Sequence, residues 1–194
     1  MGTQGQDARP RFVSEAIQTV HSLLQDSLLG ATPGLLQSFG AEATYAGELD
    51  EPGSPSGDQL VGFLGFIGPG MKGCLTVATT STAAEHLRPA ELSQLDDPPH
   101  VGDWVCELAN QLMGRVQNDV LRKTLELHLA TPTSVMGEAT LQGASKAGMT
   151  WHRYDFEGHV LSVRLSLEFP PGFAWKPGTP DSQPPLSEGA ELIF

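Results

Sequence analysis

Two long stretches of apolar, β-forming residues lie close together near the middle of the chain and constrain its fold more than any other feature. The first, "LVGFLGFIG", spans residues 60–68 and the second, "KGCLTVATT", spans 72–80, with "PGM" between them. Stretches of this composition predict strands, and so short a connection joins them as an antiparallel hairpin. The chain is therefore expected to contain an antiparallel sheet.

Helical periodicity predicts two long helices. In residues 11–29 apolar side chains recur every three or four positions, and Gly30 is placed to end the helix. The same periodicity returns in residues 100–122, after the Pro98–Pro99 pair. The apolar stripe of this second helix predicts its buried face, made of Val101, Val105, Leu108, Ala109, Leu112, Val116 and Val120.

Shorter patterns complete the predicted fold. A short helix is expected over 83–88, because Thr82 and Glu85 have the spacing of a capping box. Further strands are expected at 41–47 and in "LELHLAT", "SVMGEATL", "MTWHRYDF" and "HVLSVRLSLEF", the last two joined at Glu157–Gly158. The order predicts an α+β domain, a mainly antiparallel β-sheet packed with an N-terminal helix, a short helix and a long central helix.

Composition divides the chain into three parts. Residues 1–10 are polar and predict a flexible lead-in, and residues 11–169 hold the patterned elements of one domain. Residues 170–194 are rich in proline and predict an irregular tail. The final "ELIF" is apolar, and its pattern leaves open whether it caps the core.

Charge narrows the classes of partner. The chain carries 11 Lys and Arg residues against 23 Asp and Glu, and the basic residues are scattered. Phosphate backbones and anionic lipid surfaces bind basic clusters, so neither nucleic acid nor a membrane is an expected partner. No stretch approaches the roughly 20 apolar residues of a membrane span. The absence of an apolar signal core, with Cys74 and Cys106 predicted as free thiols, favours a cytoplasmic protein.

Motifs for other chemistry fail on context. Residues 68–73, "GPGMKG", match a dinucleotide-binding pattern, but that pattern requires a helix directly after it, where a strand is predicted. The histidines show no zinc-like clustering, and His152 and His159, on opposite arms of a predicted hairpin, are interpreted as surface residues. No G-x-S-x-G motif is present. The sequence predicts no metal bound by this chain itself.

One face of the helix predicted at 100–122 has an unusual composition. Asp103, Glu107, Asn110 and Gly114 lie three or four positions apart, so they share a face that excludes the apolar stripe. A solvated surface explains Asp103 and Glu107, but it explains Asn110 and Gly114 poorly, because both destabilise a helix interior. Spacing alone leaves two interpretations open, a solvated face and a surface presented to a partner.

This row and its surroundings resemble the CheC/CheX family of chemotaxis phosphatases, specifically its CheX-like branch. The family signature is an acidic or serine residue, E-x-x-N on a helix, a glycine soon after, and a proline roughly twenty residues further on, which is predicted here to lie on the strand after the helix. Here these positions are Asp103, Glu107, Asn110, Gly114 and Pro132. Similarity also covers "RFVSEAIQTVHSLLQDSLL", "LVGFLGFIGPGMKGCLTVATTSTAAEHL" and "HVLSVRLSLEF", so it spans about residues 11–169.

The resemblance implies a protein aspartyl-phosphate phosphatase that acts on a phosphorylated CheY-like response regulator in two-component signalling. It implies that Glu107 engages the regulator's active-site lysine and that Asn110 orients the attacking water. Asp103, Gly114 and Pro132 would support the site or contact the partner. The Mg²⁺ would belong to the regulator, so this chain would need no cofactor of its own. Such a mechanism is chemically sufficient, because an acyl phosphate is already reactive and catalysis needs mainly positioning.

Several further expectations follow from the resemblance. Members of the CheX-like branch are homodimers, which implies the same state here. Some relatives carry a second E-x-x-N on the first helix, where this chain has Glu15 and Gln18, so a single site is predicted. Gln18 is a homologous amide on a longer arm, which leaves weak activity there open. Flagellar-switch relatives suggest an alternative function, a non-catalytic docking module for a response regulator or signalling scaffold.

Overall fold

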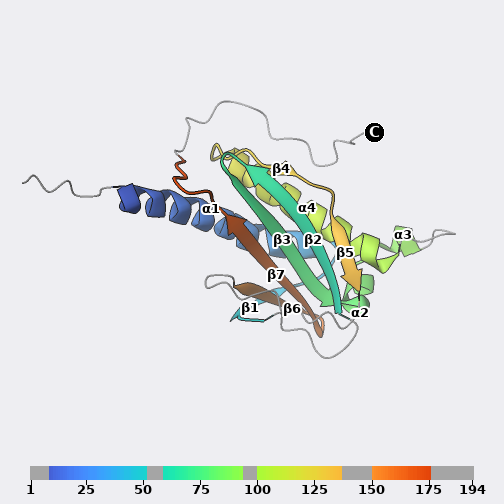
Figure 1. Cartoon of the computed structure of the whole chain (residues 1–194). Coiled ribbons are helices and arrows are strands. Elements are labelled where there is room, and N and C mark those ends of the chain that lie inside the picture. The colour runs from blue at the N-terminus through green and yellow to red at the C-terminus, as the bar shows by residue number, and fades with distance from the viewer. Residues whose placement is uncertain (1–8, 52–58, 94–99, 137–149, 176–194) are drawn as a thin grey trace, which may run out of the picture.

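The computed structural model describes residues 9–51, 59–93, 100–136 and 150–175. They form the predicted α+β fold with a mainly antiparallel sheet, and the two long helices lie on one face of that sheet (Figure 1). The helices are α1 (Arg9–Ser38), α2 (Ser81–His86), α3 (Ala90–Ser93) and α4 (Val101–Leu121). The strands are β1 (Thr44–Leu49), β2 (Gln59–Gly68), β3 (Met71–Thr80), β4 (His128–Leu129), β5 (Thr133–Met136), β6 (Trp151–Phe156) and β7 (His159–Glu168).

The sheet is built around two hairpins. The predicted β2–β3 hairpin is confirmed, with pairing that runs from Gln59 opposite Thr80 to Gly68 opposite Met71. The β6–β7 hairpin turns at Glu157 and Gly158, whose positive φ angles of 46° and 82° suit a tight two-residue hairpin turn. Long-range pairing joins these hairpins into the order β1-β6-β7-β3-β2-β4, with β5 also paired to β2.

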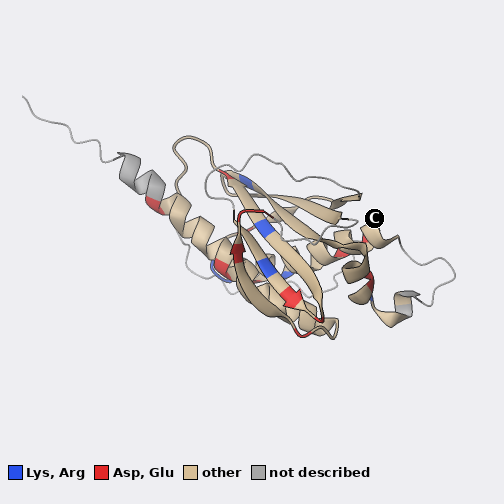
Figure 2. Cartoon of the chain, turned by 90° about the horizontal axis from the view of Figure 1, so that it is seen from below, with Lys and Arg blue, Asp and Glu red and all other residues tan. Residues whose placement is uncertain are grey.

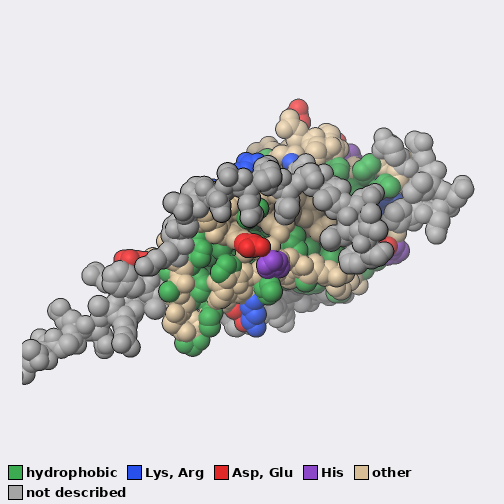
Figure 3. Space-filling view, turned by 90° about the horizontal axis from the view of Figure 1, so that it is seen from above, with side chains coloured by type: hydrophobic (Ala, Val, Ile, Leu, Met, Phe, Trp, Pro, Cys, Tyr) green, Lys and Arg blue, Asp and Glu red, His purple; other side chains and the backbone are tan. Residues whose placement is uncertain are grey.

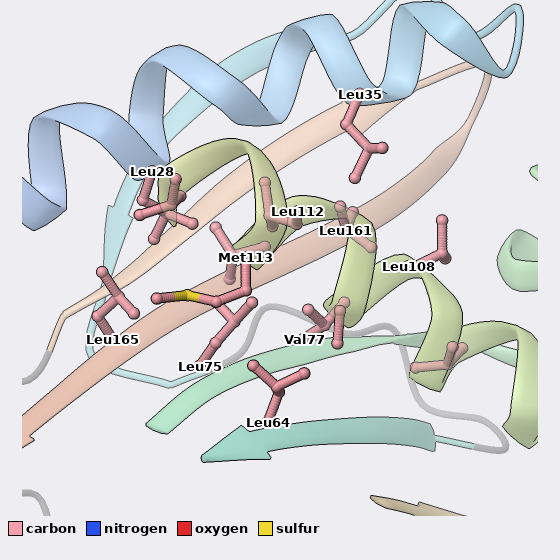
Figure 4. Packing of buried hydrophobic residues seen from close by; sticks show 14 of the residues in the cluster. Leu28, Leu35, Leu64, Leu75, Val77, Leu108, Leu112, Met113, Leu161 and Leu165 are labelled. Carbon is pink, nitrogen blue, oxygen red and sulfur yellow. The ribbon is translucent and has the colours of Figure 1, made fainter. Parts of the chain in front are cut away.

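The core lies between the helices and one face of the sheet. In Figure 4 the side chains of α4 point toward β2, β3 and β7, while α1 lies across α4 on the side away from β2 and β3. The labelled residues are all members of one buried cluster and come from five elements: Leu28, Leu35, Leu64, Leu75, Val77, Leu108, Leu112, Met113, Leu161 and Leu165. This packing holds α4 with one face buried along its length.

Helix α1 continues beyond the end that the sequence predicts. Gly30 does not stop it, and the helix runs through Pro33 to Ser38. Proline lacks the N–H that would bond to the carbonyl four residues earlier, which belongs to Leu29. The Tyr154 hydroxyl donates a long hydrogen bond of 3.4 Å to that carbonyl oxygen. Together with the burial of leucines on the last turns of α1, this contact from β6 supports a helix that local propensity would end.

The cap of the short helix also differs from the prediction. Helix α2 begins at Ser81, and its N-cap is Thr80, whose hydroxyl accepts a hydrogen bond from the Ala83 backbone N–H at 3.2 Å. The predicted capping box of Thr82 and Glu85 is therefore wrong. Glu85 instead pairs with Arg88 at 2.7 Å. Both candidate caps are threonines, so composition alone does not distinguish them.

The predicted boundaries of the domain fall partly outside the described residues. Phe173 lies beyond residue 169 and is nevertheless buried, with its ring 4.7 Å from that of Phe169. Residues 1–8 and 176–194, including "ELIF", lie outside the described ranges. The lead-in and the tail therefore stay predictions.

The surface matches the scattered charge of the sequence. In Figure 2 the Lys and Arg positions of the described residues are scattered over several elements of the ribbon. None of the helices described is both long and apolar enough to cross a lipid bilayer.

Candidate functional site

The row predicted on the long helix lies on the outward side of α4. Asp103 and Asn110 are exposed, while Glu107 and Gly114 are half-buried. The opposite side is buried and includes the predicted stripe from Val105 to Val120, to which the structure adds Trp104 and Met113. The helical spacing therefore placed the four residues on one face correctly.

The N-terminal half of α4 is fixed against the sheet at a glycine. A Cβ atom added at Gly62 on β2 would lie 2.9 Å from Val105 Cγ1 and 3.1 Å from the Val105 carbonyl oxygen. Only a residue without a side chain allows α4 to approach β2 this closely. On the other flank, the Trp104 ring meets the Phe39 ring edge-on, with centroids 5.1 Å apart. These contacts determine where Asp103 and Glu107 stand.

The C-terminal half of α4 is held by polar contacts. The Ser27 hydroxyl of α1 donates to Asp119 Oδ2 at 2.5 Å, and Lys123 Nζ donates to the same oxygen at 2.9 Å. The Ser27 hydrogen bond, with a further contribution from Lys123, lowers the pKa of Asp119. Gln117 Nε2 donates to the Leu127 carbonyl at 2.6 Å. Because both halves are anchored, the outward row is presented on a rigid element.

Within the row, each side chain has a different local environment. Glu107 Oε1 accepts a hydrogen bond from Gln111 Nε2 at 2.8 Å. Asn110 has no side-chain hydrogen-bond partner among the described residues, so both its carbonyl and its amide groups face solvent. A Cβ added at Gly114 would meet nothing within 4 Å. The row therefore offers a held carboxylate, an unengaged carboxamide one turn away, and open space beyond it.

Pro132 lies outside this row. It directly precedes β5 rather than lying within a strand, and it is half-buried. The strand that follows it does approach α4, because a Cβ added at Gly102 would lie 2.7 Å from Ser134 Oγ. The structure thus groups four of the five signature residues and places the fifth before the strand next to the start of α4.

The candidate second site lies on α1. Glu15 and Gln18 are both exposed, and the Glu15 carbonyl accepts a hydrogen bond from the Thr19 hydroxyl at 2.8 Å. The prediction of a single site is not tested by this placement. An open pocket of about 320 Å³ between α1 and α4 is separate from the row, since it is lined by Ser27, Gly30, Ala31, Gly34, Arg115 and Asp119.

His152 is not the surface residue that the sequence predicted. It is buried rather than exposed, with 2% of its surface accessible. Its Nε2 lies 3.0 Å from Gln25 Nε2 on α1, and its Nδ1 lies 3.1 Å from the Tyr45 hydroxyl on β1. His159 instead lies beside His86, with ring centroids 4.9 Å apart. No local sequence pattern indicates the burial of His152, because its partner Gln25 is far away in the sequence.

Burial of His152 predicts a pH dependence of stability. Desolvation lowers the pKa of His152 below the usual 6.5, although the nearby Glu48 acts in the opposite direction. The imidazole therefore binds a proton less readily in the folded protein than in the unfolded chain. The free energy of unfolding should be constant above pH 6.5 as far as this group is concerned, and should fall as the pH drops below 6.5 toward the folded pKa. Urea unfolding between pH 7.5 and 5 measures this, and His152→Gln should flatten the profile. An equally steep profile in the variant would contradict the assignment to His152.

Metal ligands and cysteine thiols are two other kinds of group that would bear on the chemistry of the row. Within the described ranges, no three His, Cys, Asp or Glu side chains converge to hold a metal ion. Cys74 and Cys106 are free and half-buried. Burial is the main cause that raises the pKa of the Cys74 thiol. On the face seen in Figure 3, the charged side chains of the described residues are few and lie apart from one another.

One family model matches the chain. The family model described as chemotaxis phosphatase CheX matches residues 60–157, half of the chain, and this range includes Glu107, Asn110 and Pro132. A search of curated protein sequences gives no significant match.

Several solved structures share the fold at low sequence identity. CheX from Vibrio vulnificus has a TM-score of 0.60 and 15% identity, covering 75% of this chain and 99% of that one. CheX from Desulfovibrio desulfuricans has a TM-score of 0.58 and 18% identity, with 75% and 99% covered. A CheX–CheY complex with BeF3 and Mg²⁺ from Borrelia burgdorferi has a TM-score of 0.54 and 14% identity, with 73% and 96% covered. At these identities the similarity establishes the fold.

Proposed function

Since this chain belongs to the CheX family of chemotaxis phosphatases, we propose that it accelerates hydrolysis of the aspartyl phosphate of a CheY-like response regulator through Glu107 and Asn110. The observation that carries the proposal is the outward row of α4. Glu107 and Asn110 stand one turn apart on an anchored helix, and the Asn110 carboxamide is unengaged. In the solved CheX–CheY complex a protein of this fold binds CheY, which supports a CheY-like regulator as the partner.

The proposed reaction needs few groups from this chain. A water oxygen attacks phosphorus, the bond from phosphorus to the aspartyl oxygen breaks, and the aspartate leaves as a carboxylate while the water proton passes to the phosphate. Asn110 Oδ1 accepts a hydrogen bond from the attacking water and so orients it in line with the breaking bond. Glu107 accepts a hydrogen bond from the lysine of the regulator. The Mg²⁺ that neutralises the phosphoryl charge is supplied by the regulator.

The homodimer that the family resemblance implies stays a prediction.

The proposal is tested by multiple turnover. A phosphorylated CheY-like receiver in Mg²⁺ is mixed with a substoichiometric amount of this chain, and released phosphate is followed over time. Phosphate release faster than spontaneous decay, proportional to the amount of chain added, is the expected result. Binding of the receiver without any acceleration would contradict the proposal and would support the docking module instead.

Gly114 gives a prediction that separates stability from partner binding. Because an added Cβ meets nothing within 4 Å, Gly114→Ala should stabilise the free protein, by roughly 1 kcal/mol in helix propensity. A bulky side chain at the same place, as in Gly114→Phe, should weaken receiver binding by obstructing its approach. Urea unfolding and receiver affinity measure the two effects. Native affinity in Gly114→Phe would show that the partner does not approach this turn.

A further inference from the structure

Glu107 is held by a neighbour on its own helix. Gln111 lies one turn further along α4, and its Nε2 donates to Glu107 Oε1 at 2.8 Å. Both side chains are half-buried, so neither moves as freely as a fully exposed one. Side chains on a helix lean toward its N-terminus, which brings the amide of a residue back over the residue four positions earlier. The contact is therefore a product of helical geometry.

The chemistry of this contact suits a carboxylate that must bind a cation. A glutamine amide donates a proton but carries no charge, so it orients Glu107 and leaves the negative charge intact. It occupies one of the several acceptor positions of the carboxylate, and Oε2 stays available. A lysine at the same position would also orient Glu107, but its ammonium group would compete with a cation brought by a partner.

Resting on the proposed function, we infer that Gln111 is a positioning residue, which fixes the Glu107 carboxylate for the lysine ammonium group of the receiver. Gln111 does not contact the reacting atoms. Gln111 restricts the Glu107 side chain already in the free protein. Less conformational entropy is then lost when the receiver binds, which improves the affinity. The effect should thus appear in receiver binding and in KM, while kcat stays close to native.

Two substitutions test this role with opposite side-chain chemistry. Gln111→Leu removes the donor and keeps a good helix former, and it should raise KM and the Kd for the receiver about three- to tenfold. Gln111→Lys keeps an orienting partner and a stable helix but neutralises Glu107, so it should raise KM and Kd as well. The matched control is Gln37→Leu, the same change at an exposed position of α1. It should leave both constants unchanged.

A double-mutant cycle decides whether Gln111 acts through Glu107. Affinity is measured for a receiver held active by beryllofluoride and Mg²⁺, which requires no turnover, so a failure of the proposed function is seen separately in phosphate release. If the inference is right, Gln111→Leu changes affinity in the native background but not in Glu107→Ala. Native affinity in Gln111→Leu, or an equal loss in both backgrounds, would overturn it.

Discussion

Asn110→Ala should reduce receiver dephosphorylation to nearly its spontaneous rate while the protein stays folded. The carboxamide is the group proposed to orient the attacking water, and removing one such preorganised hydrogen bond typically costs about 10² to 10³ in rate. The fold should not suffer, because Asn110 is exposed, makes no side-chain hydrogen bond among the described residues, and is replaced by a better helix former. Single-turnover decay of the phosphorylated receiver measures the rate.

Two comparisons make the Asn110 result specific. Asn118→Ala makes the same substitution two turns further along α4, where the Asn118 Oδ1 is buried and has no hydrogen-bond partner among the residues that the structure describes, and it should keep native activity. Receiver affinity of Asn110→Ala should stay near native, because binding is attributed mainly to Glu107. A variant that had lost both affinity and turnover would point to a docking role for Asn110 and contradict its assignment to water.

Gly62→Val should cause a large loss of stability, because it crowds the contact between β2 and α4. The first added carbon already lies 2.9 Å from Val105 Cγ1 and 3.1 Å from the Val105 carbonyl oxygen, and the backbone cannot rotate away. Overpacking of this kind costs about 2 to 3 kcal/mol, which lowers Tm by roughly 5 to 10 °C in a domain of this size. Relief requires α4 to move off β2, so turnover at temperatures where the variant is folded should fall too. Calorimetry and phosphate release measure the two effects.

The matched pair for this prediction is on the same strand. Gly65→Ala places its Cβ at an ordinary 3.7 Å from Ala130 Cβ, whereas Gly62→Ala meets Val105 at the distances given above. The first should be nearly neutral, and the second should be destabilising. If both variants unfolded at the native temperature, the close approach of α4 to Gly62 would not be a determinant of the fold.

Local periodicity was sufficient to predict the elements that carry the site. The outward row of α4 followed from a repeat of three and four residues, and the β2–β3 hairpin followed from two apolar stretches with a short turn. The contact from Gln111 to Glu107 also obeys the helical spacing rule, so that rule was a signal for it that the sequence analysis did not use.

Features that depend on distant residues could not be predicted in this way. Helix α1 passes Gly30 and Pro33 because leucines on its later turns are buried and Tyr154, on β6, bonds to the carbonyl left without a donor. His152 is buried because α1 and β1 both cover it. The strand order likewise places β1 beside β6, which comes much later in the chain. Each depends on tertiary packing, which overrides local propensity.

The central claim is that Glu107 and Asn110 on α4 accelerate receiver dephosphorylation. Its most direct test is the decay constant of a phosphorylated CheY-like receiver, in Mg²⁺, with saturating native chain and with saturating Asn110→Ala. The account predicts a decay constant well above the spontaneous value with the native chain, and a return to nearly the spontaneous value with the variant. Equal acceleration by both proteins, or none by the native chain despite measurable binding, would contradict it.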